Sequence, residues 1–178
     1  MRQEIGSDQA RVTFREVRDE DLPLLFELRR DLPLQSLLLT VPDALDDASL
    51  HAWVARRRED PGGMFRMIVD TAAGEAIGYT QVSQVHRKNR TGYGGISLAG
   101  KARGRGLGQA TLRELVRVAR EELGLIKLLS EVRVDNFAAL RLNLSVGYRV
   151  VGTLEAHFTD SLGDTHDVLL LERKLKNA

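Results

Sequence analysis

Residues 103–110 are Arg103-Gly104-Arg105-Gly106-Leu107-Gly108-Gln109-Ala110, and the rest of the chain is organised around them. Just before this stretch, Ile96 and Leu98 are apolar at alternate positions, which predicts the end of a half-buried strand. Just after it, apolar residues follow the i, i+3, i+4, i+7 spacing of one helix face, at Leu112, Leu115, Val116, Ala119 and Leu123. Gly124 lies where a left-handed C-cap is expected. The pattern predicts a strand, a glycine-rich turn and a helix N-terminus.

A helix N-terminus carries unpaired backbone N–H groups and the positive end of the helix dipole, which together suit a phosphate. Glycines let the backbone approach an anion, and Arg103 and Arg105 add charged donors. The spacing G-x-G-x-G is not a dinucleotide fingerprint, and no Gly-Lys-Ser/Thr follows to make a P-loop. The alternative is a tight turn with two solvated arginines.

Length and composition indicate one globular domain, expected at residues 11–178 after a flexible tail at 1–10. Hydrophobic residues make up 43% and charged residues 29%, which argues against disorder. The net charge of +1 predicts no nucleic-acid partner and no membrane surface, so an anion site has to be local.

The chain has no cysteine, which excludes disulfides and thiolate chemistry. Its four histidines show no metal-binding spacing, so we expect no metal. No apolar run reaches the length of a membrane span, and the first ten residues lack a signal-peptide core. A cytoplasmic protein is the expectation.

The remaining pattern is mixed α/β. Helices are predicted from about 19 to 32, 46 to 58 and 136 to 147, and 33–43, between Pro33 and Pro42, suits a short helix under a cleft. Strands are predicted at 12–17, 64–70, 76–85, 91–98, 126–134, 150–154 and 168–175. Only 91–134 has the strand–helix–strand form that demands a parallel pair. The glycines at 92, 94 and 95 indicate a bulge or a close backbone approach.

Three stretches resemble the GNAT superfamily of N-acetyltransferases in order and spacing. Arg103, Gly106 and Gly108 match its Arg/Gln-x-x-Gly-x-Gly/Ala pyrophosphate loop. Asn136 with Ala139, and then Gly147-Tyr148, match its later motifs. The likeness covers residues 12–175, is strongest over 91–153, and is closest to the branch acting on ribosomal-protein N-termini, polyamines and small amines or antibiotics.

The resemblance implies a mostly antiparallel, twisted sheet of about seven strands flanked by helices, with a central parallel pair splayed to hold acetyl-CoA. Pantetheine is then expected beside Ile96, Ser97 and Leu98. The pyrophosphate is expected at Arg103 and on the amides of Gly104, Arg105, Gly106, Leu107, Gly108 and Gln109. Asn136 is a further CoA contact, a plain helix N-cap, or both. The acceptor pocket is expected from the segments 32–45 and 155–166.

The implied reaction is direct acetyl transfer to a primary amine of a protein N-terminus, polyamine, amino acid or antibiotic. Glu131 and His86 are the candidate bases. Their structural alternatives are a strand carboxylate paired with Arg133 or Lys127, and a solvated turn histidine. Tyr79, Tyr93, Trp53 and Phe26 are candidates for the acceptor pocket, or else packing residues.

Asn143 stands where many members of the family carry a tyrosine that protonates the leaving thiolate. An amide donates hydrogen bonds but does not titrate. Asn143 is therefore a candidate for steadying the thiolate, and the substitution also favours a rival, a non-catalytic acyl-CoA-binding or regulatory module. A homodimer formed through the closing strands is a further expectation.

Overall fold

The computed structural model describes residues 10–175. The tail expected at 1–10 lies outside them, apart from Ala10, whose carbonyl oxygen accepts a bond from Thr71 Oγ1. The helices are η1 (Asp19–Asp21), α1 (Leu22–Arg30), α2 (Leu32–Leu37), α3 (Asp47–Arg58), η2 (Gly100–Ala102), α4 (Leu107–Glu121) and α5 (Phe137–Ser145). The strands are β1 (Val12–Arg15), β2 (Met64–Asp70), β3 (Glu75–His86), β4 (Thr91–Leu98), β5 (Lys127–Arg133), β6 (Arg149–Thr159) and β7 (Thr165–Lys174).

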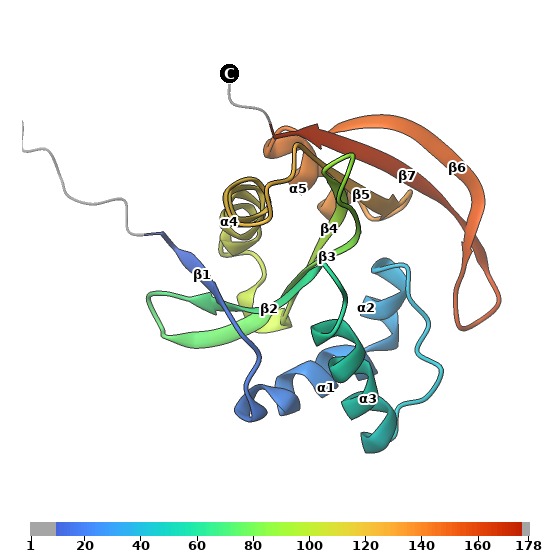
Figure 1. Cartoon of the computed structure of the whole chain (residues 1–178). Coiled ribbons are helices and arrows are strands. Elements are labelled where there is room, and N and C mark those ends of the chain that lie inside the picture. Colours follow the sequence, from blue (N-terminus) through green and yellow to red (C-terminus); the bar gives the residue numbers. More distant parts are fainter. Residues whose placement is uncertain (1–9, 176–178) are drawn as a thin grey trace, which may run out of the picture.

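One seven-stranded sheet organises the molecule, in the order β1-β2-β3-β4-β5-β7-β6 (Figure 1). Only β4 and β5 are parallel, and α4 connects them. Every other neighbouring pair is antiparallel. This confirms the predicted mixed, mostly antiparallel sheet and the parallel pair within 91–134.

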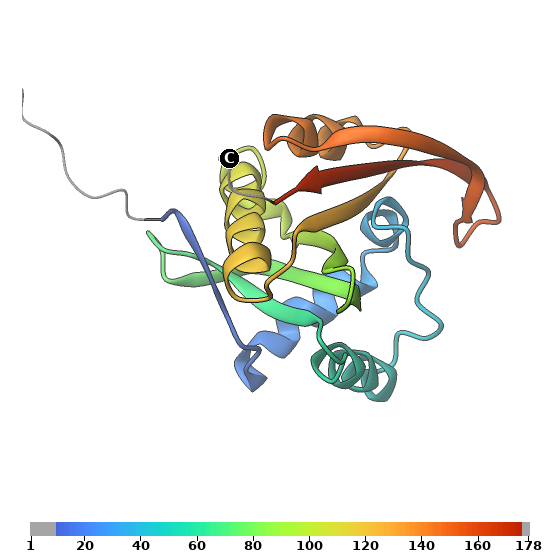
Figure 2. The same cartoon turned by 45° about the horizontal axis from the view of Figure 1, so that its top comes forward.

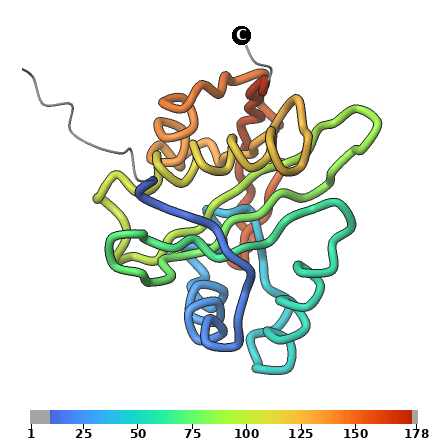
Figure 3. The backbone as a smooth tube through the Cα atoms, turned by 60° about the vertical axis from the view of Figure 1, so that its left-hand side comes forward, coloured from blue at the N-terminus to red at the C-terminus, as the bar shows by residue number. Residues whose placement is uncertain are grey.

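Helices cover both faces of the sheet, with α4 and α5 on one side and α1 and α3 on the other (Figure 3). Leu115 of α4 is fully buried against Leu128 of β5 in the core beneath the first face. Leu25 of α1 and Trp53 of α3 pack against Met67 of β2 in the core beneath the second face. The sheet is thus buried on both sides, and any site has to open at an edge or a gap.

Such a gap exists between β4 and β5. The two strands pair only from Thr91–Tyr93 to Lys127–Leu129. Beyond that point, β4 stays paired with β3 as far as Leu98, and β5 stays paired with β7 as far as Arg133. The residues after 93 and 129 therefore face each other across the sheet without a ladder between them.

The glycines of β4 behave in two ways. A Cβ on Gly94 would lie 3.2 Å from Leu115 Cδ2, so its absence lets α4 sit close to the strand, as the sequence predicts. Gly92 is similarly crowded by Val82 Cγ1 at 3.1 Å. A Cβ on Gly95 would meet nothing within 4 Å. The first two glycines serve packing, and the third leaves open space at the gap.

The closing strands are longer than predicted. β6 and β7 extend over 149–159 and 165–174 rather than 150–154 and 168–175, and they form a hairpin that projects from the molecule (Figure 2). Most residues of β6 are exposed, so its sequence lacks the apolar alternation that marks a strand. Most of the segment 155–166, expected as part of the acceptor pocket, therefore belongs to this hairpin, and none of it lines the cavity described below.

The short helix expected in 33–43 is present as α2. The Asp31 side chain caps it by accepting a bond from the Leu34 N–H at 3.0 Å. Gly124 has a φ of 66°, which confirms the left-handed C-cap after α4. Within residues 10–175, no helix is long and apolar enough to cross a membrane.

Candidate functional site

A cavity of about 280 Å³ opens where β4 and β5 part. Its walls are residues 93–97 of β4, residues 130–132 of β5, and the inner face of α5. On the other face of the sheet it is closed by α1, α3, the segment 37–40 and β3. The cavity therefore passes through the gap in the sheet and meets both layers of helices.

The glycine-rich turn lies beside this cavity at the start of α4. Gly104 and Gly106 have φ values of 71° and 73°, the left-handed region that glycine adopts without strain. Gly106 is the N-cap of α4 and supplies no side-chain cap. The first bond into the helix runs from the Ala110 N–H to the Gly106 oxygen, so the N–H groups of 107–109 precede it. They are free to bind an anion.

The arginines of the turn anchor it. Arg103 Nη2 donates to the Leu98 carbonyl oxygen at 3.2 Å, which ties the turn to the end of β4. Arg105 Nη2 pairs with the buried carboxylate of Asp70 at 2.8 Å. Arg11 Nη2 donates to the Arg105 oxygen at 2.7 Å. Arg11 was not among the predicted residues, because it is 92 positions from the motif in sequence.

The remaining residues of the turn join it to the core and to α5. Leu107 is 1% exposed and packs with Ile68 and Ile77. A Cβ on Gly108 would lie 3.0 Å from Leu142 Cδ2, and Leu142 lines the cavity. Gln109 Nε2 donates to Ser145 Oγ at 3.2 Å. The turn is thus held rigidly against one wall of the cavity.

The edge of β4 offers open hydrogen-bonding groups to this space. From Gly94 to Leu98 the strand has no partner on the side that faces β5. Ser97 is 2% exposed and lies opposite Tyr79 in the β3–β4 ladder, where the two side chains interact. The open groups at this edge are therefore those of the backbone. An extended polar chain beside Ile96, Ser97 and Leu98, ending in a phosphate at residues 107–109, fits these groups.

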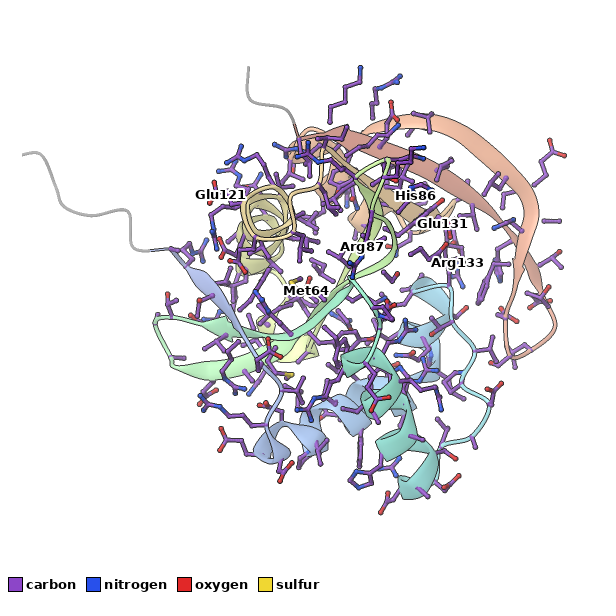
Figure 4. The ribbon with its side chains drawn as sticks, in the orientation of Figure 1. Met64, His86, Arg87, Glu121, Glu131 and Arg133 are labelled. Carbon is purple, nitrogen blue, oxygen red and sulfur yellow. The ribbon has the colours of Figure 1, made fainter. Side chains whose placement is uncertain are left out.

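Glu131 points out from β5 at the cavity (Figure 4). It is exposed and forms no ion pair among the described residues. Its two expected structural partners are occupied elsewhere, since Arg133 pairs with Asp135 at 2.6 Å and Lys127 with Glu172 at 3.0 Å. The structure leaves the Glu131 carboxylate free to accept a proton or a donor.

His86 does not belong to the cavity wall. It is exposed at the end of β3, two residues beyond Gln84, the last residue of that strand lining the cavity. Its Nδ1 accepts a bond from the Asn89 N–H at 3.0 Å, which closes the β3–β4 turn. His86 thus helps to close the turn, as its structural alternative has it, and its role as a base stays a prediction.

Two side-chain amides line the cavity, those of the N-cap of α5 and of a residue within that helix. Asn136 Oδ1 caps the helix by accepting from the Ala139 N–H at 3.2 Å, so its N-cap role is confirmed. Asn143 is 7% exposed, and its Nδ2 donates to the Ala139 oxygen at 2.8 Å. An amide nitrogen carries two hydrogens, so Asn143 keeps one for another acceptor.

Aromatic residues and an arginine close the opposite end. Trp53 is 5% exposed, stacks edge-on against Tyr79, and its Nε1 has no partner among the described residues. Burial raises the pKa of Tyr79. Arg29 lies over the Trp53 ring at 5.0 Å. Burial lowers the pKa of the Arg29 guanidinium.

The cavity wall includes Tyr79, Tyr93 and Trp53, three of the residues expected at an acceptor pocket, but not Phe26. Phe26 instead packs edge-on against His51, with 5.0 Å between ring centroids. The wall also includes Arg29 and Arg57, which sequence reasoning missed. Both stand near helix C-termini, where arginines ordinarily face water, so no local signal separates them from their neighbours.

The structure thus combines a splayed parallel pair, a helix N-terminus whose first amides precede the helical bonds, and a cavity through the sheet. The family model for the acetyltransferase (GNAT) domain matches residues 11–149. The chain therefore belongs to the GNAT acetyltransferase family. Acetyl-CoA is the cosubstrate of this family.

Two relatives and one solved structure extend the comparison. The N-alpha-acetyltransferase RimI of Mycobacterium tuberculosis is 36% identical over 97 residues, which cover 53% of this chain and 59% of that protein. The chain thus matches less than two thirds of the length of RimI. The L-amino acid N-acetyltransferase AaaT of Escherichia coli is 23% identical over 144 residues, covering 80% and 85%. The spermidine N-acetyltransferase of Vibrio cholerae, crystallised with CoA and spermine, superposes with a TM-score of 0.84 at 19% identity, covering 94% and 97%.

The anion site at residues 103–109 predicts a thermal shift. Acetyl-CoA at 100 times its Kd should stabilise the chain by roughly 2.7 kcal/mol, and Gly106→Val should abolish the shift. Valine at a φ of 73° is strained, and its Cβ would lie 3.0 Å from Arg11 Nη1. Differential scanning fluorimetry measures both.

The matched control is Gly74→Val. Gly74 has a φ of 70° in the β2–β3 turn, with nothing within 4 Å of a Cβ. Gly74→Val should lose about as much stability as Gly106→Val, but it should keep the full thermal shift with acetyl-CoA. If acetyl-CoA leaves the melting curve of the unmodified chain unmoved, the assignment of this site is wrong.

Proposed function

We propose that the chain is an N-acetyltransferase that transfers the acetyl group of acetyl-CoA directly to a primary amine. The observation that carries the proposal is the cavity between β4 and β5, whose wall contains the Glu131 carboxylate and also Leu142, against which Gly108 of the glycine-rich turn packs. The names of RimI, AaaT and the spermidine enzyme all describe N-acetylation, which supports the same reaction class.

The cosubstrate is proposed to lie along the free edge of β4, beside Ile96, Ser97 and Leu98. Its pyrophosphate would rest on the amides of 104–109, while Arg103, Arg105 and Arg11 hold that turn in shape. Asn136 offers its side-chain nitrogen, because only its oxygen is used by the helix cap. Acetyl-CoA supplies an activated thioester carbonyl.

The amine of the acceptor attacks that carbonyl. A carbon–nitrogen bond forms, the carbon–sulfur bond breaks, and CoA departs as a thiolate. A primary amine with a pKa of about 10.4 is mostly protonated at pH 7, so a proton must leave before attack. Glu131 is proposed to take it, directly or through water. A free N–H at the end of β4 would stabilise the oxyanion, and Asn143 would steady the thiolate.

The alternative is a non-catalytic module that binds acyl-CoA. The observation that favours it is Asn143, which cannot protonate a thiolate. A screen for free thiol release distinguishes the two, with acetyl-CoA and a panel of peptides, amino acids, polyamines and aminoglycosides. Turnover with any acceptor establishes the enzyme. Binding of acetyl-CoA without turnover would overturn the proposal in favour of the module. A cytoplasmic location and a homodimer stay predictions.

Glu131→Gln should lower kcat/KM by about 100-fold, because the amide cannot accept a proton from the amine. The thermal shift with acetyl-CoA should persist, since Glu131 is not placed at the cofactor turn. His86→Gln should change kcat/KM far less. Steady-state thiol release against acceptor concentration measures these effects.

Glu155→Gln is the control for loss of a strand carboxylate, because Glu155 is exposed on β6 and lies outside the cavity wall. The kcat/KM of Glu155→Gln should equal that of the unmodified chain. Activity within two-fold of normal in Glu131→Gln would exclude the carboxylate as the base and leave proton removal to water.

Asn143→Ala should reduce kcat by about 10- to 150-fold, the equivalent of one charge-assisted hydrogen bond to the thiolate. The control is Leu144→Ala on the same helix, which removes an exposed side chain outside the cavity and should leave kcat unchanged. Single-turnover kinetics at saturating acceptor isolates the chemical step. An unchanged rate in Asn143→Ala would contradict a role for this amide.

A further inference from the structure

The charges around the cavity are unevenly distributed. Its charged wall residues are Arg29, Arg57 and Glu131. The two arginines come from α1 and α3, on the face opposite α4 and α5, whereas Glu131 comes from β5. The end of the cavity away from the cofactor turn therefore presents two positive charges, in a protein whose overall net charge is only +1.

Arg29 is half-buried without a carboxylate partner among residues 10–175. Its Nη1 donates to two neutral oxygens, Gln35 Oε1 at 2.7 Å and Thr40 Oγ1 at 3.1 Å. Asp43 attracts it from a distance but forms no ion pair with it. Its Nε and Nη2 have no partner in the described chain. The two bonds from Nη1 hold the Arg29 side chain in place, while the N–H groups of Nε and Nη2 are available to a ligand.

Arg57 adds to the same positive charge. It forms no hydrogen bond or ion pair with a described residue, and it is half-buried between the cavity and a second, shallower hollow. That hollow shares Arg29, Trp53 and Arg57 with the cavity and also contains Arg56, Glu59 and Asp60. The two acids line the hollow and not the cavity, and neither forms an ion pair with Arg29 or Arg57.

Trp53 lies in the cavity wall beneath the Arg29 guanidinium, whose carbon is 5.0 Å from the ring centroid. The ring covers one face of the guanidinium and takes none of its N–H donors. A carboxylate is the acceptor that suits the remaining donors of such a fork.

These observations separate two kinds of amine. A polyamine brings further positive charges into a space with two arginines and one carboxylate, where like charges repel. An amine that also carries a carboxylate places that group against Arg29 and Arg57. The same electrostatics therefore attracts the second kind of amine and rejects the first.

We propose that the acceptor is an amino acid, whose carboxylate is bound by Arg29 and Arg57 while its amine faces Glu131. The inference rests on the proposed N-acetyltransferase function and narrows its substrate class. The apolar residues Leu37, Leu38 and Leu39 in the same wall provide contacts for the amino-acid side chain.

The test compares each of the twenty L-amino acids with its own carboxamide, and both with spermidine, in a free-thiol assay on the full chain with saturating acetyl-CoA. The carboxamide keeps the amine and the side chain but removes the negative charge. For the preferred amino acid, the carboxamide should raise KM by about 10- to 150-fold with little change in kcat. Spermidine should be a poorer substrate than that amino acid.

Arg29→Gln and Arg57→Gln should each reduce the preference for the acid over its carboxamide, and Arg29→Lys should restore part of it. Arg58→Gln is the matched control on α3, since Arg58 is exposed and outside both hollows. If the Arg29 variants are unstable, Arg57→Gln still tests the proposal. Arg57 forms no hydrogen bond or ion pair with a described residue, so its replacement removes no such contact.

The possible results distinguish the proposal of an amino-acid acceptor from the proposed N-acetyltransferase function on which it rests. An acid preference that depends on these arginines supports it. A preference for spermidine, equal rates for acid and carboxamide, or a preference unaffected by both substitutions overturns the inference and leaves the N-acetyltransferase intact. Binding of acetyl-CoA without turnover of any acceptor overturns both.

Discussion

The parallel pairing of β4 with β5 covers only three residues on each strand. The candidate site depends on the early end of this pairing. Had the ladder continued, the backbone N–H and C=O groups of residues 94–98 and 130–133 would have bonded to one another. The sheet would then have no gap at this point. Because each strand is held by its other neighbour, the gap does not collapse. An ordered sheet therefore carries unpaired backbone edges, which ordinarily attract another extended chain. We propose that the chain bound here is the cosubstrate, acetyl-CoA.

The anion site is built to need little rearrangement. Two left-handed glycines shape the turn, and the side chains of Arg11, Asp70 of β2 and the turn arginines hold it in place. Arg103 and Arg105 use part of their donors for this anchoring, and the amides at the start of α4 are further donors for an anion. Preorganised dipoles of this kind bind phosphate without the ordering penalty of flexible side chains. The low net charge of the chain is consistent with a local anion site.

The sequence predicted the elements whose signals are local. The turn at 103–110, its flanking strand and helix, and the N-cap Asn136 are each set by neighbouring residues. The full extent of β6 escaped prediction because both its faces are exposed, leaving no alternation to detect. That His86 lies outside the cavity wall could not be predicted, because strand spacing alone does not reveal where the β3–β4 hairpin passes the gap. Arg29 and Arg57 were not predicted as cavity residues, because a charged residue on a helix ordinarily faces water. Only the surrounding fold shows that these two are half-buried.

The central claim is that acetyl-CoA occupies the gap between β4 and β5 with its pyrophosphate on the start of α4. Amide hydrogen exchange with and without acetyl-CoA tests it at the level of individual segments. We expect added protection at residues 94–98 and 104–109, and none in the projecting part of the β6–β7 hairpin. Protection confined to the hairpin, or no protection of 94–98 and 104–109 at saturating acetyl-CoA, would contradict the account.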